Sequence, residues 1–300
     1  MKDYSLSEQF AMIALDGQDS KNDTKAKKAA VAGIAVAITL QKMIAEEIDK
    51  NATAFSEKLN KELKSIKKMN KKERNAIESE MAEILKTRGV LSEIPSLLAC
   101  DINYQTANVT IKEYKSDSTE YQCIVDFVRA EILEPGNVDL EVVCLLYLFR
   151  ESGCMHDIFS VKEQQQIQMR LLELKEKEPL YKVIWDSEFY SRKLDIYLSF
   201  LRMKSSLFKN PYLQGVNLVF PFLDRKQAIF IDMVLLGTSV HERRKATVEY
   251  LIEQGHVCEE VQIGEEHLLK IDNKYYRIWP GSRRYFKIPV QGISLVPVYK

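Results

Sequence analysis

The sequence has no excess of either charge, and it lacks the glycine-rich loops that bind nucleotides. Its 300 residues contain 43 lysines and arginines against 43 aspartates and glutamates. Attraction of the whole molecule to nucleic acid or to an anionic membrane is therefore not expected, and such binding would need a local patch. Neither GxGxxG nor GxxxxGKS/T occurs, which excludes nucleotide binding by those two motifs.

Cysteine and histidine give no sign of a disulfide framework or a metal site. The five cysteines are odd in number and form no CxxC pair, which argues against a disulfide scaffold and against a cysteine-based zinc site. Three histidines near the C-terminus have neither HxH nor HExxH spacing, namely His241, His256 and His267. We therefore expect no metal and no cofactor.

Cys154, His156 and Asp157 are close enough in sequence to suggest a nucleophile and its base. Catalysis needs such groups to converge in space, and neighbours in a connection between helices seldom do. We interpret them as a helix end, with His156 near the helix dipole, and predict a protein that is not an enzyme. The start, MKDYSLSEQF, lacks the pattern of an export signal, so a cytoplasmic location is expected.

What the sequence does contain is a long apolar helix over residues 24–48. From Ala29 it reads AAVAGIAVAITL, and Ala29, Gly33 and Ala37 place very small side chains on one strip of the helix. Such a strip lets another backbone approach closely. The apolar run is shorter than the roughly 20 residues that a membrane span needs, and lysines precede it. We predict a central core helix.

Further helices are predicted by their caps and by apolar spacing. Ser5 with Glu8, and Ser160 with Glu163, form capping boxes that start helices. Residues 90–111 alternate weakly and contain a proline, which indicates a short hairpin or wing. The sequence thus predicts a mostly α-helical domain with a short β wing over residues 1–209.

The periodicity changes after Asn210-Pro211. Ser239 caps a helix that closes at Gly255, and the segments after it alternate with period two. Asp272-Asn273 and Pro280-Gly281 are predicted as turns between these strands. Residues 210–300 therefore form, by this prediction, a smaller α+β module with antiparallel strands.

A lysine-rich run lies between residues 61 and 74. Its cations outnumber Glu62 and Glu73, the two acids within it. The run could be a basic landing surface for phosphates, or the solvated face of a helical hairpin that turns near Asn70. Composition alone favours the solvated hairpin, because lysine-rich exposed faces are common. The cations are Lys61, Lys64, Lys67, Lys68, Lys71, Lys72 and Arg74.

Basic and aromatic residues also alternate near the C-terminus. On a sheet face they could hold phosphates or stack on bases, or place rings at a membrane interface. The plainer interpretation is an amphipathic hairpin with its rings in the core, and we favour it. The candidate phosphate or nucleic-acid contacts are Lys274, Arg277, Trp279, Arg283 and Arg284.

Three blocks of sequence carry a family resemblance. They are SLSEQFAMIALDG followed by a polar loop and KKAAVAGIAVAITLQKMI, then ILKTRGVLSEIPSLLACDINY, then ILEPGNVDLEVVCLLYLFRESGCMHDIFSVKEQQQIQMRLLEL. Together they resemble the Golgi phosphoprotein 3 family over roughly residues 4–200. The resemblance implies a multi-helix, non-enzymatic fold that docks on membranes by binding phosphatidylinositol 4-phosphate. It also implies an adaptor role, since eukaryotic members hold glycosyltransferases in the Golgi.

The residues of the family's headgroup pocket are not conserved in this chain. That pocket uses a tryptophan and three arginines, and our alignment places Asp23, Ala32, Glu78 and Glu80 at those positions. Acidic groups repel a phosphate instead of pairing with it. If anionic lipid is bound, other cations must bind it: Lys25, Lys27, Lys28, Lys67, Lys68, Lys71, Lys72 and Arg74.

Three functions remain open at this point. The first is a peripheral membrane adaptor that binds phosphatidylinositol 4-phosphate or anionic lipid. The second is a lipid-independent scaffold that binds a protein through the C-terminal module. The third, less expected, is a nucleic-acid-binding protein that uses the wing and the C-terminal strands.

Overall fold

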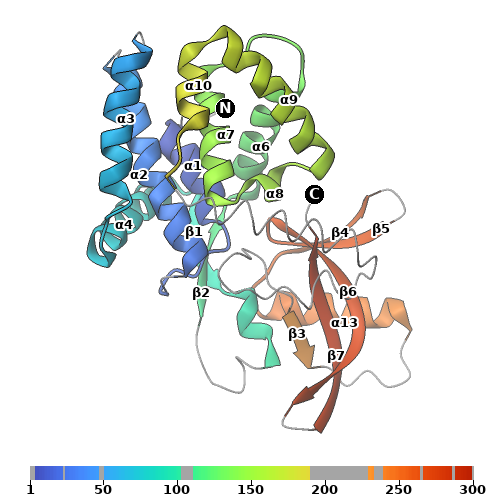
Figure 1. The fold of residues 1–300 in the computed structure, drawn as a ribbon. Helices are drawn as coiled ribbons and strands as arrows, with labels where there is room; N and C mark the ends of the chain where they lie inside the picture. The colour runs from blue at the N-terminus through green and yellow to red at the C-terminus, as the bar shows by residue number, and fades with distance from the viewer. Residues whose placement is uncertain are drawn as a thin grey trace.

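The computed structural model contains a helical body and a sheet module, which are connected by a β wing (Figure 1). It describes residues 4–22, 24–46, 51–102, 111–189, 229–232, 239–263, 266–285 and 288–298. The expected combination of a mostly helical part and a smaller part with antiparallel strands is confirmed. The predicted boundary at residue 210 lies outside the described residues.

The helical body is built from α-helices whose starts are fixed by side-chain caps. Both predicted capping boxes form, with Ser5 N donating to Glu8 at 2.8 Å and Ser160 N donating to Glu163 at 2.8 Å. The described helices of the body are α1 (Leu6–Leu15), α2 (Lys25–Ala45), α3 (Ala52–Ile66), α4 (Lys71–Thr87), α6 (Ser118–Leu133), α7 (Leu140–Ser152), α8 (Met155–Ile158), α9 (Val161–Lys177) and α10 (Pro179–Asp186).

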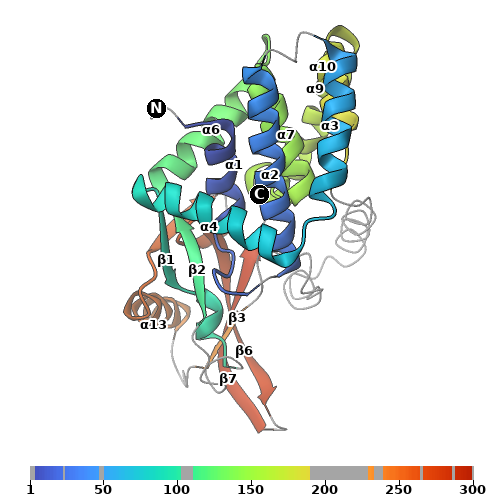
Figure 2. The same ribbon diagram turned by 90° about the vertical axis from the view of Figure 1, so that its left-hand side faces the viewer.

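Helix α2 lies at the centre of the body, as the sequence predicts, and packs against α1, α3, α4 and α7 (Figure 2). A Cβ atom placed on Gly33 would come within 2.5 Å of the Phe10 ring, so the small residue is what lets α1 approach. Ile34, Val36 and Leu40 are fully buried. By length and composition α2 could cross a membrane, but half of its most apolar window is already buried inside the protein.

Among the described residues, the sheet module has five antiparallel strands and one helix packed on the sheet. The strand order is β3-β7-β6-β5-β4, and residues of α13 (Val240–Glu253) share a core with one face of the sheet. The strands are β3 (Ile229–Asp232), β4 (Cys258–Ile263), β5 (Glu266–Ile271), β6 (Lys274–Tyr285) and β7 (Ile288–Val298).

One of the two predicted turns in the module is correct and the other is wrong. Asp272-Asn273 joins β5 to β6, and Asp272 adopts a left-handed φ of 55°. Pro280-Gly281 instead lies inside β6, where Gly281 pairs with Gly292 of β7. A proline has no N–H to donate to a neighbouring strand. It is tolerated here because β5 pairs with β6 only as far as Tyr276, so the β5–β6 ladder has no hydrogen bond at position 280.

The wing joins the two parts. It consists of β1 (Leu91–Pro95) paired with β2 (Lys112–Ser116), and of the short 3₁₀ helix η2 (Leu97–Cys100). Leu97 and Cys100 pack in the core of the sheet module. Asp101 accepts a hydrogen bond from the Phe230 backbone at 2.9 Å. In sequence the wing lies within the helical body, but its residues pack against both the helical body and the sheet module.

We predict that enlarging Gly33 separates α1 from α2. Gly33→Val should lower the free energy of unfolding by about 1 to 3 kcal/mol, because the added atoms collide with the buried Phe10 ring. Urea denaturation measures this value. Adding Phe10→Leu should make the double variant lose less than the sum of the single changes, and strict additivity would contradict the contact.

Candidate functional site

Four lysines of the predicted lipid-binding set lie around one exposed turn. Lys67 ends α3, Asn70 caps α4, and the chain turns between them as the sequence predicts. The four side chains are exposed and form no ion pair within the described parts of the chain: Lys67, Lys68, Lys71 and Lys72. We call this group the lysine turn. It presents positive charge to solvent, where an anionic surface could reach it.

Arg74, predicted as part of the same cluster, has a different environment. Its side chain is half-buried, and Nη1 donates to the Met69 carbonyl at 2.7 Å. The guanidinium thus bonds to the backbone of the turn. The structure therefore places Arg74, a predicted lipid contact, in a half-buried position apart from the four exposed lysines.

Lys27 is buried, which removes it from the predicted lipid-binding surface. Its Nζ lies 2.7 Å from Glu78 Oε1 and donates to the Asp19 carbonyl at 2.9 Å. The Lys27 and Glu78 side chains are only 4% and 7% exposed. Glu78 also accepts a hydrogen bond from the Tyr114 hydroxyl at 3.0 Å. Burial, together with the charge of Glu78, raises the pKa of Tyr114.

The other residues at the start of α2 lie near the lysine turn. Figure 2 shows the beginning of α2 and the α3–α4 turn at the same end of the helical body. Lys28 is half-buried there, and the side chain of Lys25 is outside the described set. Lys21 is exposed in the loop before α2 and was missed. Its position next to a predicted helix start could have indicated it.

The positions aligned with the family's headgroup pocket do not form a phosphate site. Ala32 is buried, Glu80 is exposed, and Asp23 lies outside the described residues. Glu78 holds Lys27 in a closed ion pair, so this cation already has its anion. A headgroup would have to displace a buried carboxylate to reach Lys27.

The C-terminal basic residues are divided between two faces of β6. Because side chains alternate along a strand, Lys274 and Arg284 lie on one face, and Arg277, Trp279 and Arg283 lie on the other. The predicted cluster is thus not one continuous surface.

Two members of that cluster are also held by acids of the wing. Lys274 Nζ is 3.6 Å from Glu113 Oε1, and its side chain is 11% exposed. It passes over Gly17, where an added Cβ would lie 1.6 Å from the amine. Arg283 Nη1 lies 3.3 Å from Asp101 Oδ2, although its side chain remains 47% exposed. Lys274 therefore joins the module to the body and is not a surface contact.

Buried polar contacts continue across the same junction. Asp272 accepts from Lys115 at 2.6 Å and lies 2.9 Å from the His256 ring nitrogen. Burial alone would raise the pKa of Asp272, but these two partners outweigh it and lower the pKa to about 2. Asn273 donates to Asp16 and to the Ser116 carbonyl, each at 3.0 Å. The turn of the sheet module is therefore bonded to the body and the wing.

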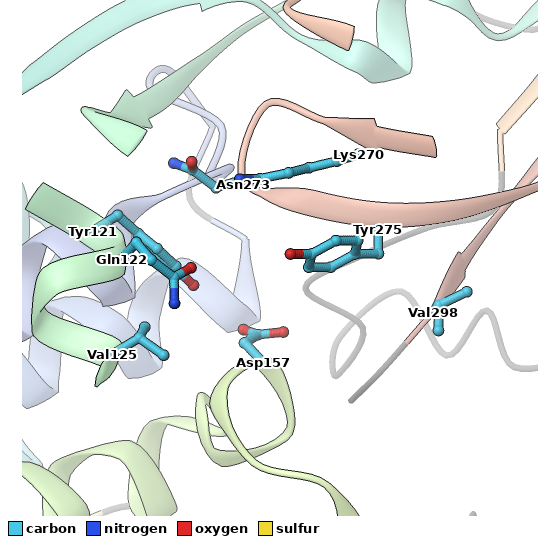
Figure 3. Close-up of a pocket in the computed structure, with 8 residues that line it drawn as sticks. All are labelled: Tyr121, Gln122, Val125, Asp157, Lys270, Asn273, Tyr275 and Val298. Atoms are coloured by element: carbon cyan, nitrogen blue, oxygen red, sulfur yellow. The ribbon is translucent and has the colours of Figure 1, made fainter. Parts of the chain in front are cut away.

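A small cleft lies at this junction, between α6, α8 and the β5–β6 hairpin (Figure 3). The Tyr121 and Tyr275 rings face it from opposite sides, with Asp157 and Lys270 at its margin. Its volume is about 10 Å³, which suits roughly one water molecule. The cleft is too small for a substrate.

The sequence neighbours considered as a nucleophile and its base differ in burial, since His156 and Asp157 are half-buried. Cys154 is fully buried, with Sγ 3.1 Å from Ser152 Oγ. The His156 ring nitrogen lies 3.1 Å from the Gln164 amide. His241 and His267 of the sheet module are exposed. Within the ranges that the structure describes, no group of three or more His, Cys, Asp or Glu could hold a metal ion.

Comparison with protein-family models, with curated proteins and with solved structures finds no match for this chain.

We predict that Lys27 and Glu78 stabilise the protein only as a pair. Lys27→Met alone should cost about 3 to 5 kcal/mol of unfolding free energy, because it leaves a buried carboxylate without its cation. The double change Lys27→Met with Glu78→Leu should cost less than Lys27→Met alone. Chemical denaturation of the three proteins checks this order. A double variant at least as unstable as Lys27→Met alone would contradict it.

Proposed function

We propose that the protein is a non-enzymatic, peripheral membrane adaptor that docks on anionic lipid through the lysine turn. The observation that carries the proposal is the exposure of Lys67, Lys68, Lys71 and Lys72 together, without acidic partners among the described residues. Each basic residue near an anionic leaflet contributes about 1 kcal/mol. Four of them suffice for reversible attachment without a headgroup pocket.

The proposal includes membership of a Golgi phosphoprotein 3-like family for the first two thirds of the chain. The order of elements supports it: α1, the small-residue helix α2, a helix that ends at Gly89, and then a two-stranded wing. The buried helix α7 and the capped helix α9 follow in the order of the third block. A cytoplasmic location and an adaptor role come with this proposal.

The lipid partner, on this proposal, is anionic lipid in general. The closed pair of Lys27 and Glu78 argues against selection of phosphatidylinositol 4-phosphate, since no described cation at that position is left for a phosphate. A surface of mobile lysines responds to charge density, and salt weakens it. Nucleic-acid binding receives less support, because the C-terminal basic residues are divided between two faces.

We predict that vesicle binding depends on the lysine turn and not on the headgroup. The full chain should co-sediment equally with vesicles that carry phosphatidylserine or phosphatidylinositol 4-phosphate at matched surface charge, and not with neutral vesicles. Replacing Lys67, Lys68 and Lys71 by Ala should weaken binding by about a hundredfold, because three contributions of about 1 kcal/mol are lost. The measurement is the bound fraction against lipid concentration at physiological salt.

The matched control removes three exposed lysines elsewhere on the helical body: Lys162, Lys177 and Lys182. This variant has the same net charge as the test variant and should bind nearly as well as the unmodified chain. Equal loss in both variants would mean that net charge alone decides binding. Binding only to phosphatidylinositol 4-phosphate would contradict the proposed lack of headgroup selection, and no binding at all would reject the lipid function.

A further inference from the structure

Strand β4 is an outer strand of the sheet, and its far edge has no strand partner in the described structure. Proteins usually protect such an edge with a proline, a bulge, charged side chains or a very short strand, because unpaired backbone groups attract other chains. The six residues of β4 contain no proline, and their register with β5 is unbroken. The two charged residues of β4 are Glu259 and Glu260, which disfavour pairing with another acidic strand and leave the edge open to a strand of opposite charge.

The backbone groups that face outward can be assigned from one hydrogen bond. Asp272 N donates to the Val257 carbonyl at 2.8 Å, so the backbone of Val257 faces β5. Hydrogen-bonded and non-bonded pairs alternate in an antiparallel ladder. The N–H and C=O groups of Cys258 and Glu260 therefore point away from the sheet.

On one face of this edge, apolar and acidic side chains alternate. Val257 is 61% exposed, Val261 is half-buried, and both share one face with the exposed Glu259. Glu260 is exposed on the opposite face, where Arg244 of α13 lies 3.8 Å from it. An incoming strand would meet valines and carboxylates.

The surroundings of the edge carry both acids and bases. Glu253 is exposed at the end of α13, and Ile252 beside it is 54% exposed. The nearby cations are Arg244 of α13 beside Glu260, Lys245, which lies 3.9 Å from Glu249, and Lys270 of β5, which pairs with Glu259 across the ladder. The strand itself carries two acids and no base, so a partner strand beside it is favoured when it carries basic residues.

We propose that β4 binds an extended, lysine- or arginine-bearing segment of a partner protein as a sixth strand. Backbone hydrogen bonds to Cys258 and Glu260 would supply the pairing, and side chains would supply the choice of partner. Residues directly opposite each other on one face interact most strongly. In antiparallel pairing, the partner would have the pattern Val-Lys-Lys-x-Val. Its valines would lie opposite Val261 and Val257, and its lysines opposite Glu260 and Glu259.

The test is a titration of the full chain against a fluorescein-labelled peptide, Thr-Val-Lys-Lys-Thr-Val-Thr, followed by fluorescence anisotropy. The peptide should bind, and its analogue with both lysines replaced by glutamate should bind at least about tenfold more weakly. Glu260→Pro should also lose about tenfold, since it removes an outward N–H and leaves the ladder to β5 intact.

Two controls separate strand addition from simple charge attraction. Glu260→Gln removes the same charge but keeps the N–H, so it should bind more tightly than Glu260→Pro. N-methylation removes backbone N–H groups of the peptide. Peptides methylated at the N–H groups that face β4 should not bind, whereas methylation of the N–H groups on the opposite edge should have little effect. This second measurement needs no variant of the protein, so it holds even if Glu260→Pro fails to fold.

Three results would overturn the proposal: no peptide binding at millimolar concentration, equal binding of the lysine and glutamate peptides, or equal effects of the two methylation patterns. The lipid proposal concerns a different surface. Loss of vesicle binding in the lysine-turn variant with unchanged peptide binding would show that the two sites act separately.

Discussion

The buried ion pair between Lys27 and Glu78 is the constraint on which the arrangement of the body and the wing depends. Removing two charges from water costs several kcal/mol per ion, and a buried pair is tolerated only when further hydrogen bonds satisfy it. Here the Asp19 carbonyl and the Tyr114 hydroxyl provide those bonds. One pair thereby fixes α2, α4, the loop before α2 and strand β2 relative to one another.

Tyr114 carries this constraint to the sheet module. Its neighbours on β2, Glu113 and Lys115, contact Lys274 and Asp272 on the far side of the wing. Side chains alternate across a strand, so one short strand can face the helical body with Tyr114 and the module with the residues beside it. The wing is for this reason a structural joint between the two parts.

The parts of the fold that sequence could predict are those set by local chemistry. Capping boxes at Ser5, Ser160 and Ser239 start helices because the bonds involved span three residues. The Asp272-Asn273 turn is likewise local. Pro280-Gly281 was wrongly predicted as a turn. A proline interrupts a strand only where a neighbouring strand needs an N–H at that position, and the local sequence does not show where the neighbouring strands end.

The candidate site was harder to predict, because exposure is decided by distant residues. Lys27 and Lys28 are adjacent and identical in type, yet Lys27 is buried by a glutamate 51 positions further along the chain. Lys274 and Arg284 differ in the same way, since Glu113 holds Lys274 and Arg284 stays exposed. No local pattern distinguishes these outcomes. The exposure of the lysine turn was predictable, because the chain reverses there and its lysines form no ion pair with a described acid.

A net charge of zero conceals the separation of charge on which both proposals rest. The lysine turn is basic and belongs to the helical body, whereas the edge of β4 is acidic and belongs to the sheet module. The wing joins them through buried contacts such as Asp101 with Phe230 and Asp272 with Lys115. A partner strand on β4 would therefore keep one orientation relative to a membrane at the lysine turn. That geometry is what an adaptor requires.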